Sequence, residues 1–405
     1  MFVLFTKGFF WETPEKLPSS LHTSFSSAFS TLNQSNLFQY DAVQPGRKKL
    51  SRTFVTRTLV GNPGSTYRYL GLRLFSHPWC DVDANGNQYN ENYITTHEDD
   101  ESKRKASKRD FNSSKIIIRE GSSLIHLGYE RSTVDGLLSI GKINSFLIQR
   151  SNKILQNQIE DSVPEKLVGS ADYSLTLINK MEPSSIKKDF SIAVYHELQD
   201  MHGSPSIMKH HGKTDVEPWK VALRISGDEH RKKSPPLTVP LPSGALYYML
   251  DDFNHKHEHA VLAGAETLRY SSTHRVAREG NGTWQYIRDK CNTVLDQTTS
   301  IYSQDHINTV KRKAFVKEVR KHQKLFIEIE FEWIRQWLIQ GRLHADLHPY
   351  WHAPIQTLKN HYAELEQYSV KILNLLKESS DKNNDLSKTN TLTSEELYDV
   401  MIEEI

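Results

Sequence analysis

The stretch HEHAVLAGAETLRYSSTHRVA, residues 257–277, places side chains that can bind a metal ion close to side chains that can bind a carboxylate. It predicts two successive strands, and alternate residues of a strand face the same way. His257 and His259 therefore share one face of the first strand. One face of the second strand carries two arginines. Because arginine can meet a carboxylate with two parallel hydrogen bonds, we predict that this face binds an anion. That face carries Arg269, Ser271, Thr273 and Arg275.

The flanking residues predict the elements that must position this stretch. Short β-branched and aromatic runs between Pro and Gly turns are typical of a barrel or a jelly-roll sandwich. An amphipathic helix is predicted over 18–35, where Leu21, Phe25 and Phe29 recur every four residues. Strands are predicted at 191–196, 219–226, 236–240, 245–250, 257–263 and 269–276.

Residues 51–75 are also rich in β-branched and aromatic residues. The sequence Asn62-Pro63-Gly64 interrupts them, which predicts a strand, a turn and a second strand. Because side chains alternate along a strand, the second strand should have a leucine face and a tyrosine face. These faces are expected to carry Leu70, Leu72 and Leu74, and Tyr67 and Tyr69, respectively.

From about residue 286 the apolar period becomes that of helices. We therefore predict an α+β chain in which a double-stranded β-helix (jelly-roll) domain, 1–287, precedes an all-α domain, 288–380. A polar linker and an acidic tail helix follow over 381–405. Apolar residues in the helical part include Leu325, Ile329, Trp333, Trp337 and Trp351.

Composition limits the classes of function. The formal net charge of +2 excludes a polycation that coats nucleic acid, so such a contact needs a local site. Two distant cysteines indicate a reducing compartment, and neither a signal peptide nor a membrane span is predicted. Residues 95–110 are predicted to form a charged loop, and its KRKASKR run predicts a nuclear location, with the cytoplasm as a further one left open.

Three longer blocks carry a resemblance to a known family. LPSGALYYMLDDFNHKHEHAVLAGAETLRYSSTHRVA (241–277), TRTLVGNPGSTYRYLGLRLF (56–75) and EIEFEWIRQWLIQG (328–341) occur in the family's order. They resemble the FTO (fat mass and obesity-associated) family of jelly-roll Fe(II)/2-oxoglutarate dioxygenases, which demethylate N6-methyladenine. Taken alone, a histidine followed ten residues later by an arginine also fits an ordinary strand histidine with exterior arginines.

The resemblance implies ligands, residue roles and partners. His259 matches the last of three iron ligands. The organic ligands are 2-oxoglutarate and methylated RNA or single-stranded nucleic acid, and the helical domain would contact the catalytic domain or partner proteins. Matches to the 2-oxoglutarate contacts are Asn179, Tyr247, Arg269, Ser271 and Arg275. Matches to the base pocket are Arg57, Tyr67, Tyr69 and Leu70.

One part of the family pattern is missing. Where the family has a strand followed by His-x-Asp, this chain has only SSIKKDF (184–190). The resemblance therefore identifies one of three iron ligands and no catalytic residue, which makes iron binding doubtful. Two hypotheses follow: an oxidative demethylase, or a degenerate homologue that binds nucleic acid or serves as a scaffold. Loss of a strand should also leave an unpaired sheet edge.

Overall fold

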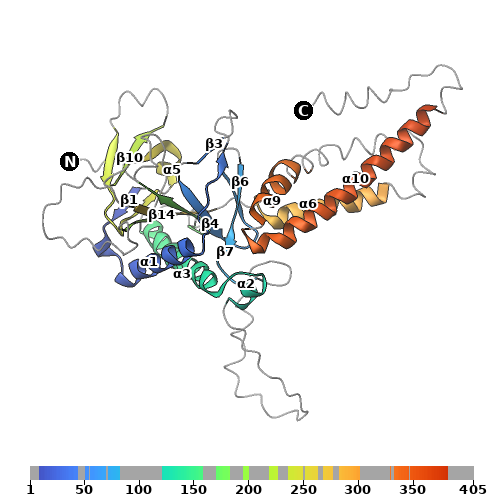
Figure 1. Ribbon diagram of the computed structural model, residues 1–405. Coiled ribbons are helices and arrows are strands. Elements are labelled where there is room, and N and C mark those ends of the chain that lie inside the picture. The colour runs from blue at the N-terminus through green and yellow to red at the C-terminus, as the bar shows by residue number, and fades with distance from the viewer. Residues whose placement is uncertain are drawn as a thin grey trace, which may run out of the picture. The chain divides into compact units, whose positions relative to one another are not determined.

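The computed structural model of this chain (Figure 1) comprises two compact units, Met1–Thr283 with His344–Trp351, and Trp284–Leu343 with His352–Ile405. They are considered separately below. The structure describes residues 9–43, 51–53, 55–69, 72–82, 121–157, 170–182, 195–199, 219–226, 236–249, 251–262, 268–276, 282–301, 329, 333–345 and 347–381.

The first unit is built on a seven-stranded sheet. Neighbouring strands are antiparallel, except that β4 and β7 are parallel. Strands that lie side by side come from distant parts of the sequence, so the N-terminal β1 pairs with β12. The order is β1 (Phe9–Glu12), β12 (Leu246–Met249), β9 (Tyr195–Gln199), β14 (Leu268–Arg275), β8 (Leu175–Met181), β4 (Thr56–Gly61) and β7 (His77–Pro78).

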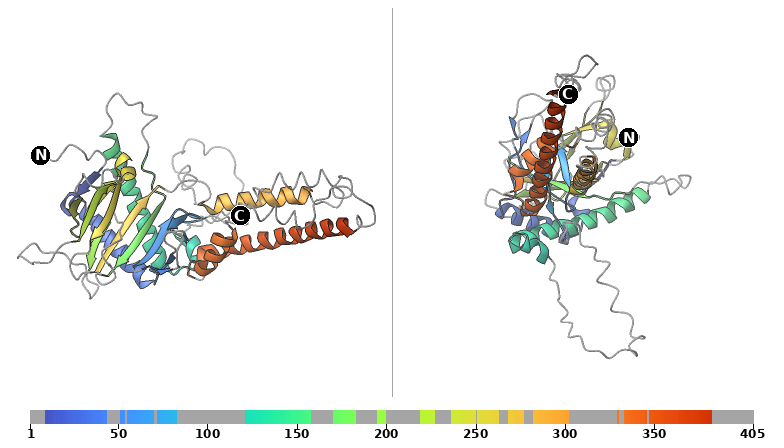
Figure 2. Two further views of the ribbon diagram at one scale, coloured as in Figure 1. Left: turned by 90° about the horizontal axis from the view of Figure 1, so that it is seen from above. Right: turned by 90° about the vertical axis from the view of Figure 1, so that its right-hand side faces the viewer.

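Helices α1 (Ser19–Gln34) and α3 (Arg131–Gln156) cover one face of this sheet (Figure 2). The predicted helix over 18–35 is confirmed. Phe25 and Phe29 are fully buried, and the Phe29 ring stacks on Tyr270 of β14 with centroids 5.6 Å apart. Burying each such ring stabilises the fold by about 1.5 to 3 kcal/mol. The helix ends where Asn36 adopts a left-handed conformation, which asparagine tolerates.

A three-stranded sheet, in the order β11-β10-β13, supplies the second layer. Val261 of β13 and Trp219, directly before β10, pack in one core with Met181 and Tyr247 of the large sheet. Two sheets that share a core agree with the predicted jelly roll. The bounds are β10 (Lys220–Ile225), β11 (Leu237–Pro240) and β13 (His257–Leu262). These strands, with β12 and β14, confirm the strands predicted from 219 to 276.

Among the described strands, β13 pairs only with β10 and so lies at the edge of the small sheet. This strand carries His259. The unpaired edge expected from a lost strand stays a prediction, because the residues around the predicted deletion lie outside the described part. The predicted strand at 191–196 begins among residues outside the described part, and β9 (Tyr195–Gln199) contains its end.

The prediction of one strand after the Asn62 turn was wrong. The chain instead forms a hairpin of β5 (Thr66–Tyr69) and β6 (Leu72–Phe75), in which Tyr67 pairs with Leu74. Directly opposed residues of two strands share a face. The tyrosines therefore lie on the same face as Leu74, and Tyr67, Tyr69 and Leu74 pack in one cluster. The turn itself is confirmed, and Gly64 at φ +76° takes a conformation that favours glycine.

The segment His344–Trp351 packs on β6 and β7 through aromatic rings. The Trp351 indole donates a hydrogen bond to the carbonyl of Ser76 at 2.8 Å. His77 stacks on His348 with centroids 3.7 Å apart, and His344 meets His348 edge-on. Burial lowers the pKa of His77 to about 3, helped by His344, and lowers the pKa of His344 to about 4. Burial also lowers the pKa of His348 well below its usual range, helped by His77 and His344, so all three imidazoles are neutral.

We expect this histidine cluster to make the fold sensitive to acid. The unfolded chain takes up protons below pH 6.5 and the folded one does not, so the stability is present above pH 6.5 and is lost as the pH falls toward 3. For His77 the loss at pH 5 is about 2 kcal/mol. The free energy of unfolding, measured with urea at pH 7.5 and 5, should differ between the two pH values by about 2 kcal/mol less in His77→Phe than in the wild type. Exposed His126→Phe is the control, and equal pH dependence in all three proteins would contradict the expectation.

Short elements complete the first unit. They are η1 (Pro14–Lys16), β2 (Ala42–Val43), β3 (Ser51–Arg52), α2 (Ser122–His126), α5 (Asp251–Lys256) and η9 (Pro349–Trp351).

The second unit is helical where it is described, as predicted. It contains α6 (Trp284–Ile301), a π-helical stretch η8 (Trp333–Leu338), most of α9 (Ile339–Ala345) and α10 (His352–Asp381). Trp337 is fully buried in it. None of the helices described in either unit is long and apolar enough to cross a membrane. The predicted loop at 95–110 and tail at 381–405 lie outside the described residues, apart from Asp381.

Candidate functional site

The predicted binding residues converge on the face of the large sheet that the helices leave uncovered. In the strand register, Arg57 of β4 lies opposite Asn179 of β8, which lies opposite Ser271 of β14. Their side chains therefore share one face, here called the inner face. Arg269 has the same parity as Ser271, and Tyr247 joins the core cluster beneath this face.

Arg269 lies near the start of β14, the middle strand of the large sheet, and is fully buried. Its Nη1 donates to the sulfur of Met181 at 3.1 Å, and its guanidinium lies 5.3 Å from the centre of the Trp219 ring. Burial lowers the pKa of Arg269 to about 10, and the neighbouring Tyr247 acts in the opposite sense. At neutral pH the side chain is therefore a desolvated cation, which favours an anionic partner.

The residues next to Arg269 offer further hydrogen bonds. Ser271 Oγ, Thr273 Oγ1 and Arg275 Nε are buried and have no hydrogen-bond partner among the described residues. Buried polar atoms are normally paired, so three on one face indicate a place for a polar ligand. This donor set, Arg269 and Ser271 with Arg275 further along the strand, fits a carboxylate group.

His259 faces the same space from the small sheet. Val261, two residues along β13, packs in the core between the sheets, so His259 also points inward. Burial lowers the pKa of His259 to about 4, and the charge of Arg275 acts in the same direction. Its imidazole is thus neutral, the form that binds metals. His257, which shares this face, stacks on Phe253 at 3.8 Å.

The described residues do not fit an iron centre. A facial triad needs two histidines and a carboxylate. Within the described ranges, no group of three or more His, Cys, Asp or Glu side chains could hold a metal ion. Two His-x-Asp sequences occur elsewhere in the chain. In one of them, His344 packs against Phe75 and His348 rather than in this site. The other such sequence, His97-Glu98-Asp99, lies outside the described part.

The residues matched to the base pocket lie beside Arg269, Ser271 and Arg275, here called the carboxylate clamp. The Arg57 guanidinium stacks 4.2 Å from the centre of the Tyr69 ring, and Arg275 lies 5.6 Å from the centre of Tyr67. The two tyrosine rings are 6.4 Å apart. The structure thus brings three of the four predicted residues together, whereas Leu70 lies outside the described residues.

Three neighbours of the site were not predicted from the sequence. Trp219 and Met181 contact Arg269, and Asp41 forms an ion pair with Arg57. Met181 was within reach of sequence reasoning, because it lies two residues after Asn179 and so shares its face. Asp41 belongs to a segment with no strand signal, so only the fold could reveal it.

Two facing sheets, a buried arginine beside unpaired hydroxyls and an inward histidine define a site of the 2-oxoglutarate-dependent dioxygenase type. Comparison with known proteins agrees. The family model of the FTO catalytic domain matches residues 4–190 and 184–278, and that of the FTO C-terminal domain matches 282–405. The alpha-ketoglutarate-dependent dioxygenase FTO of Xenopus laevis is 28% identical over 390 residues, covering 88% of this chain and 71% of the relative. The chain therefore belongs to the FTO family.

The match to the catalytic-domain model is divided into two segments. They meet and overlap at residues 184–190. This is the short junction where the sequence predicts that the strand and its His-x-Asp are missing. Recognition of the FTO family is thus confirmed, and the position of the break in the match supports the predicted deletion.

Proposed function

We propose that this chain recognises the two organic substrates of FTO-type demethylation: 2-oxoglutarate and N6-methyladenine in RNA or single-stranded DNA. The inner face carries this proposal, because it joins a buried arginine with unpaired hydroxyls to a wall of aromatic rings. The far carboxylate of 2-oxoglutarate would accept hydrogen bonds from Arg269 and Ser271. Asn179 and Tyr247 would border the rest of the molecule.

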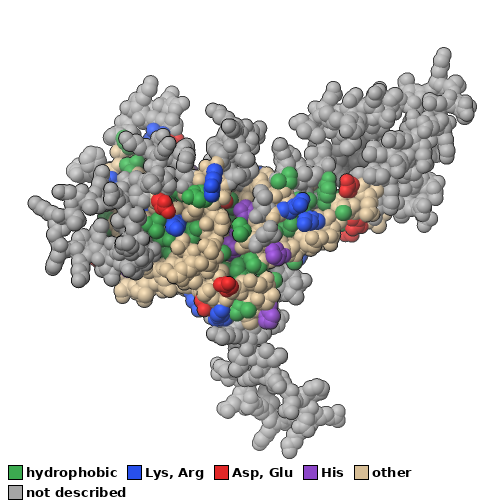
Figure 3. Space-filling model, in the orientation of Figure 1, with side chains coloured by type: hydrophobic (Ala, Val, Ile, Leu, Met, Phe, Trp, Pro, Cys, Tyr) green, Lys and Arg blue, Asp and Glu red, His purple; other side chains and the backbone are tan. Residues whose placement is uncertain are grey.

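The methylated base would enter beside Tyr67 and Tyr69. A flat aromatic base stacks well on such rings, and a base has to leave its stack to reach a buried site. On the face shown in Figure 3, basic and acidic side chains of the described residues are interspersed. This agrees with the net charge of +2 and favours recognition by the pocket over recognition by a broad basic surface.

A second candidate function is complete oxidative demethylation with Fe(II) as cofactor. It is favoured by the match to a dioxygenase over 88% of the chain. Against it stands the metal side of the site, because the described residues contain no group of three or more side chains that could hold a metal ion. Binding without turnover is therefore the function that the geometry supports best.

Binding and turnover are separable in one experiment. The purified chain is titrated with 2-oxoglutarate and with a methylated single-stranded oligonucleotide, then incubated with both, Fe(II) and air. We expect both ligands to bind and no product to form. Equal amounts of succinate and formaldehyde would establish the second candidate instead. If the chain bound neither 2-oxoglutarate nor the oligonucleotide, both candidate functions would be contradicted.

Location and partners are part of the same proposal. The basic run within 95–110 supports a nuclear protein that encounters methylated RNA there, with the cytoplasm as the alternative. The helical C-terminal domain is proposed to contact the catalytic domain or partner proteins.

A further inference from the structure

Asp41 contacts Arg57, a residue of the proposed base pocket, and the proposed function gives Asp41 no role of its own. Its Oδ2 lies 2.8 Å from Arg57 Nε, and both side chains are buried, with 7% and 4% of their surfaces exposed. The Arg57 guanidinium meanwhile lies over the Tyr69 ring. Arg57 therefore makes two different contacts: the Asp41 carboxylate lies beside its Nε, and its Cζ lies over the Tyr69 ring.

The backbone around Asp41 is fixed on both sides. Gln39 and Arg57 exchange backbone hydrogen bonds, each 2.9 Å long. The Asp41 N–H donates to Thr53 Oγ1 at 3.0 Å, and its carbonyl accepts from the Thr53 N–H at 2.9 Å. These bonds tie the carboxylate to β4 and to the chain beside β3. Because its backbone is fixed by these bonds, Asp41 can hold Arg57 in one position.

Keeping this carboxylate buried is costly. Burial raises the pKa of Asp41 to about 6, although the charge of Arg57 lowers it. In addition, Asp41 Oδ2 and Arg57 Nε make no aligned hydrogen bond despite their short distance. A buried ion pair of this kind is weak evidence for stability, so a role in positioning Arg57 explains it better.

We propose that Asp41 is a positioning residue that holds the Arg57 guanidinium flat against Tyr69, so that the pair forms one wall of the methyladenine pocket. The inference rests on the proposed function, because it takes the base as the ligand of this wall. Arginine in this position presents N–H donors at the edge of a flat surface, which suits the edge of a purine. Among the described residues, the charged group shown to act on Asp41 is Arg57 of β4.

Binding of N6-methyladenosine, a nucleoside without a phosphate, tests the role of Asp41. At pH 7.5 Asp41→Asn should weaken nucleoside binding roughly 10-fold, the loss expected for one charged contact. Binding of 2-oxoglutarate should stay unchanged, because Arg269 supplies it. The wild type should lose nucleoside affinity as the pH falls through about 6, where Asp41 becomes protonated. Asp41→Asn should lack this pH dependence.

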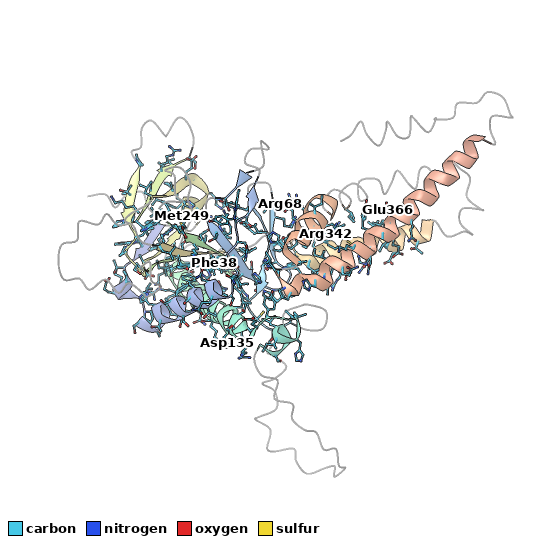
Figure 4. The ribbon with its side chains drawn as sticks, viewed as in Figure 1. Phe38, Arg68, Asp135, Met249, Arg342 and Glu366 are labelled. Atoms are coloured by element: carbon cyan, nitrogen blue, oxygen red, sulfur yellow. The ribbon has the colours of Figure 1, made fainter. Side chains whose placement is uncertain are left out.

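Controls separate positioning from folding. Asp135→Asn removes an exposed, ion-paired carboxylate on α3, labelled in Figure 4, and should change neither affinity. If Asp41→Asn lowers the melting temperature, Arg57→Lys tests the same wall. Lysine keeps the positive charge but has no planar guanidinium, so this variant should show the same loss of nucleoside affinity. The double variant should then be no weaker than either single one.

The outcomes are distinguishable. Wild-type affinity in Asp41→Asn at both pH values, or losses that add in the double variant, would overturn the inference while leaving the proposed function intact. A wild type that binds no N6-methyladenosine at pH 7.5 would instead remove the proposed function.

Discussion

Replacing Arg269 by methionine is expected to weaken the binding of 2-oxoglutarate at least about 30-fold, because losing one member of a buried charge pair costs about 2 to 5 kcal/mol. Methionine keeps much of the length of the side chain in a core that already contains Met181 and Trp219. Isothermal titration calorimetry measures the affinity directly.

Arg224 provides the matched control for this variant. It lies on β10 in the same unit and forms an exposed pair with Glu258 at 2.8 Å. Exposed pairs contribute little, so Arg224→Met should bind 2-oxoglutarate like the wild type. If Arg269→Met retained affinity within about threefold of the control, the clamp assigned to the inner face would be wrong.

Restoring the missing segment should create an iron site. The variant carries the part of the Xenopus laevis relative that aligns to the gap, inserted between Pro183 and Ser191. Loss of even an outer partner of a metal ligand costs roughly 10- to 100-fold in affinity, so two new direct ligands should raise the affinity for Fe(II) by more than about 100-fold. Anaerobic titration with Fe(II), followed by assay of formaldehyde with a methylated oligonucleotide, checks both binding and turnover.

A glycine and serine segment of equal length is the control for this insertion. It lengthens the junction without adding ligands or strand-forming residues, so its iron affinity should equal that of the wild type. Equal iron affinity in both insertion variants would show that the deletion is not what limits metal binding.

Much of this fold could be predicted from the sequence. Alternation in 257–277 gave two strands and the shared face of Arg269 and Ser271, because side-chain direction in a strand is a local property. The fourfold spacing of Phe25 and Phe29 gave α1 for the same reason. The partners of those faces were not predictable, since pairing of β14 with β8 joins residues far apart in the sequence.

The errors and omissions have physical causes. Alternation of tyrosine and leucine over 66–75 looks the same for one long strand and for a tight hairpin, so the fold of β5 on β6 was missed. Asp41 was missed because its role comes from one contact with a residue on another strand. The packing of His344–Trp351 with the first unit depends on rings from β6 and β7 and has no local pattern.

The most direct test of the central claim is a calorimetric titration of the wild-type chain with 2-oxoglutarate in the presence of a metal chelator. If the inner face retains the carboxylate-binding residues, the chain should bind one 2-oxoglutarate saturably without iron, and Arg269→Met should bind it at least about 30-fold more weakly. Absence of saturable binding by the wild type would contradict the account.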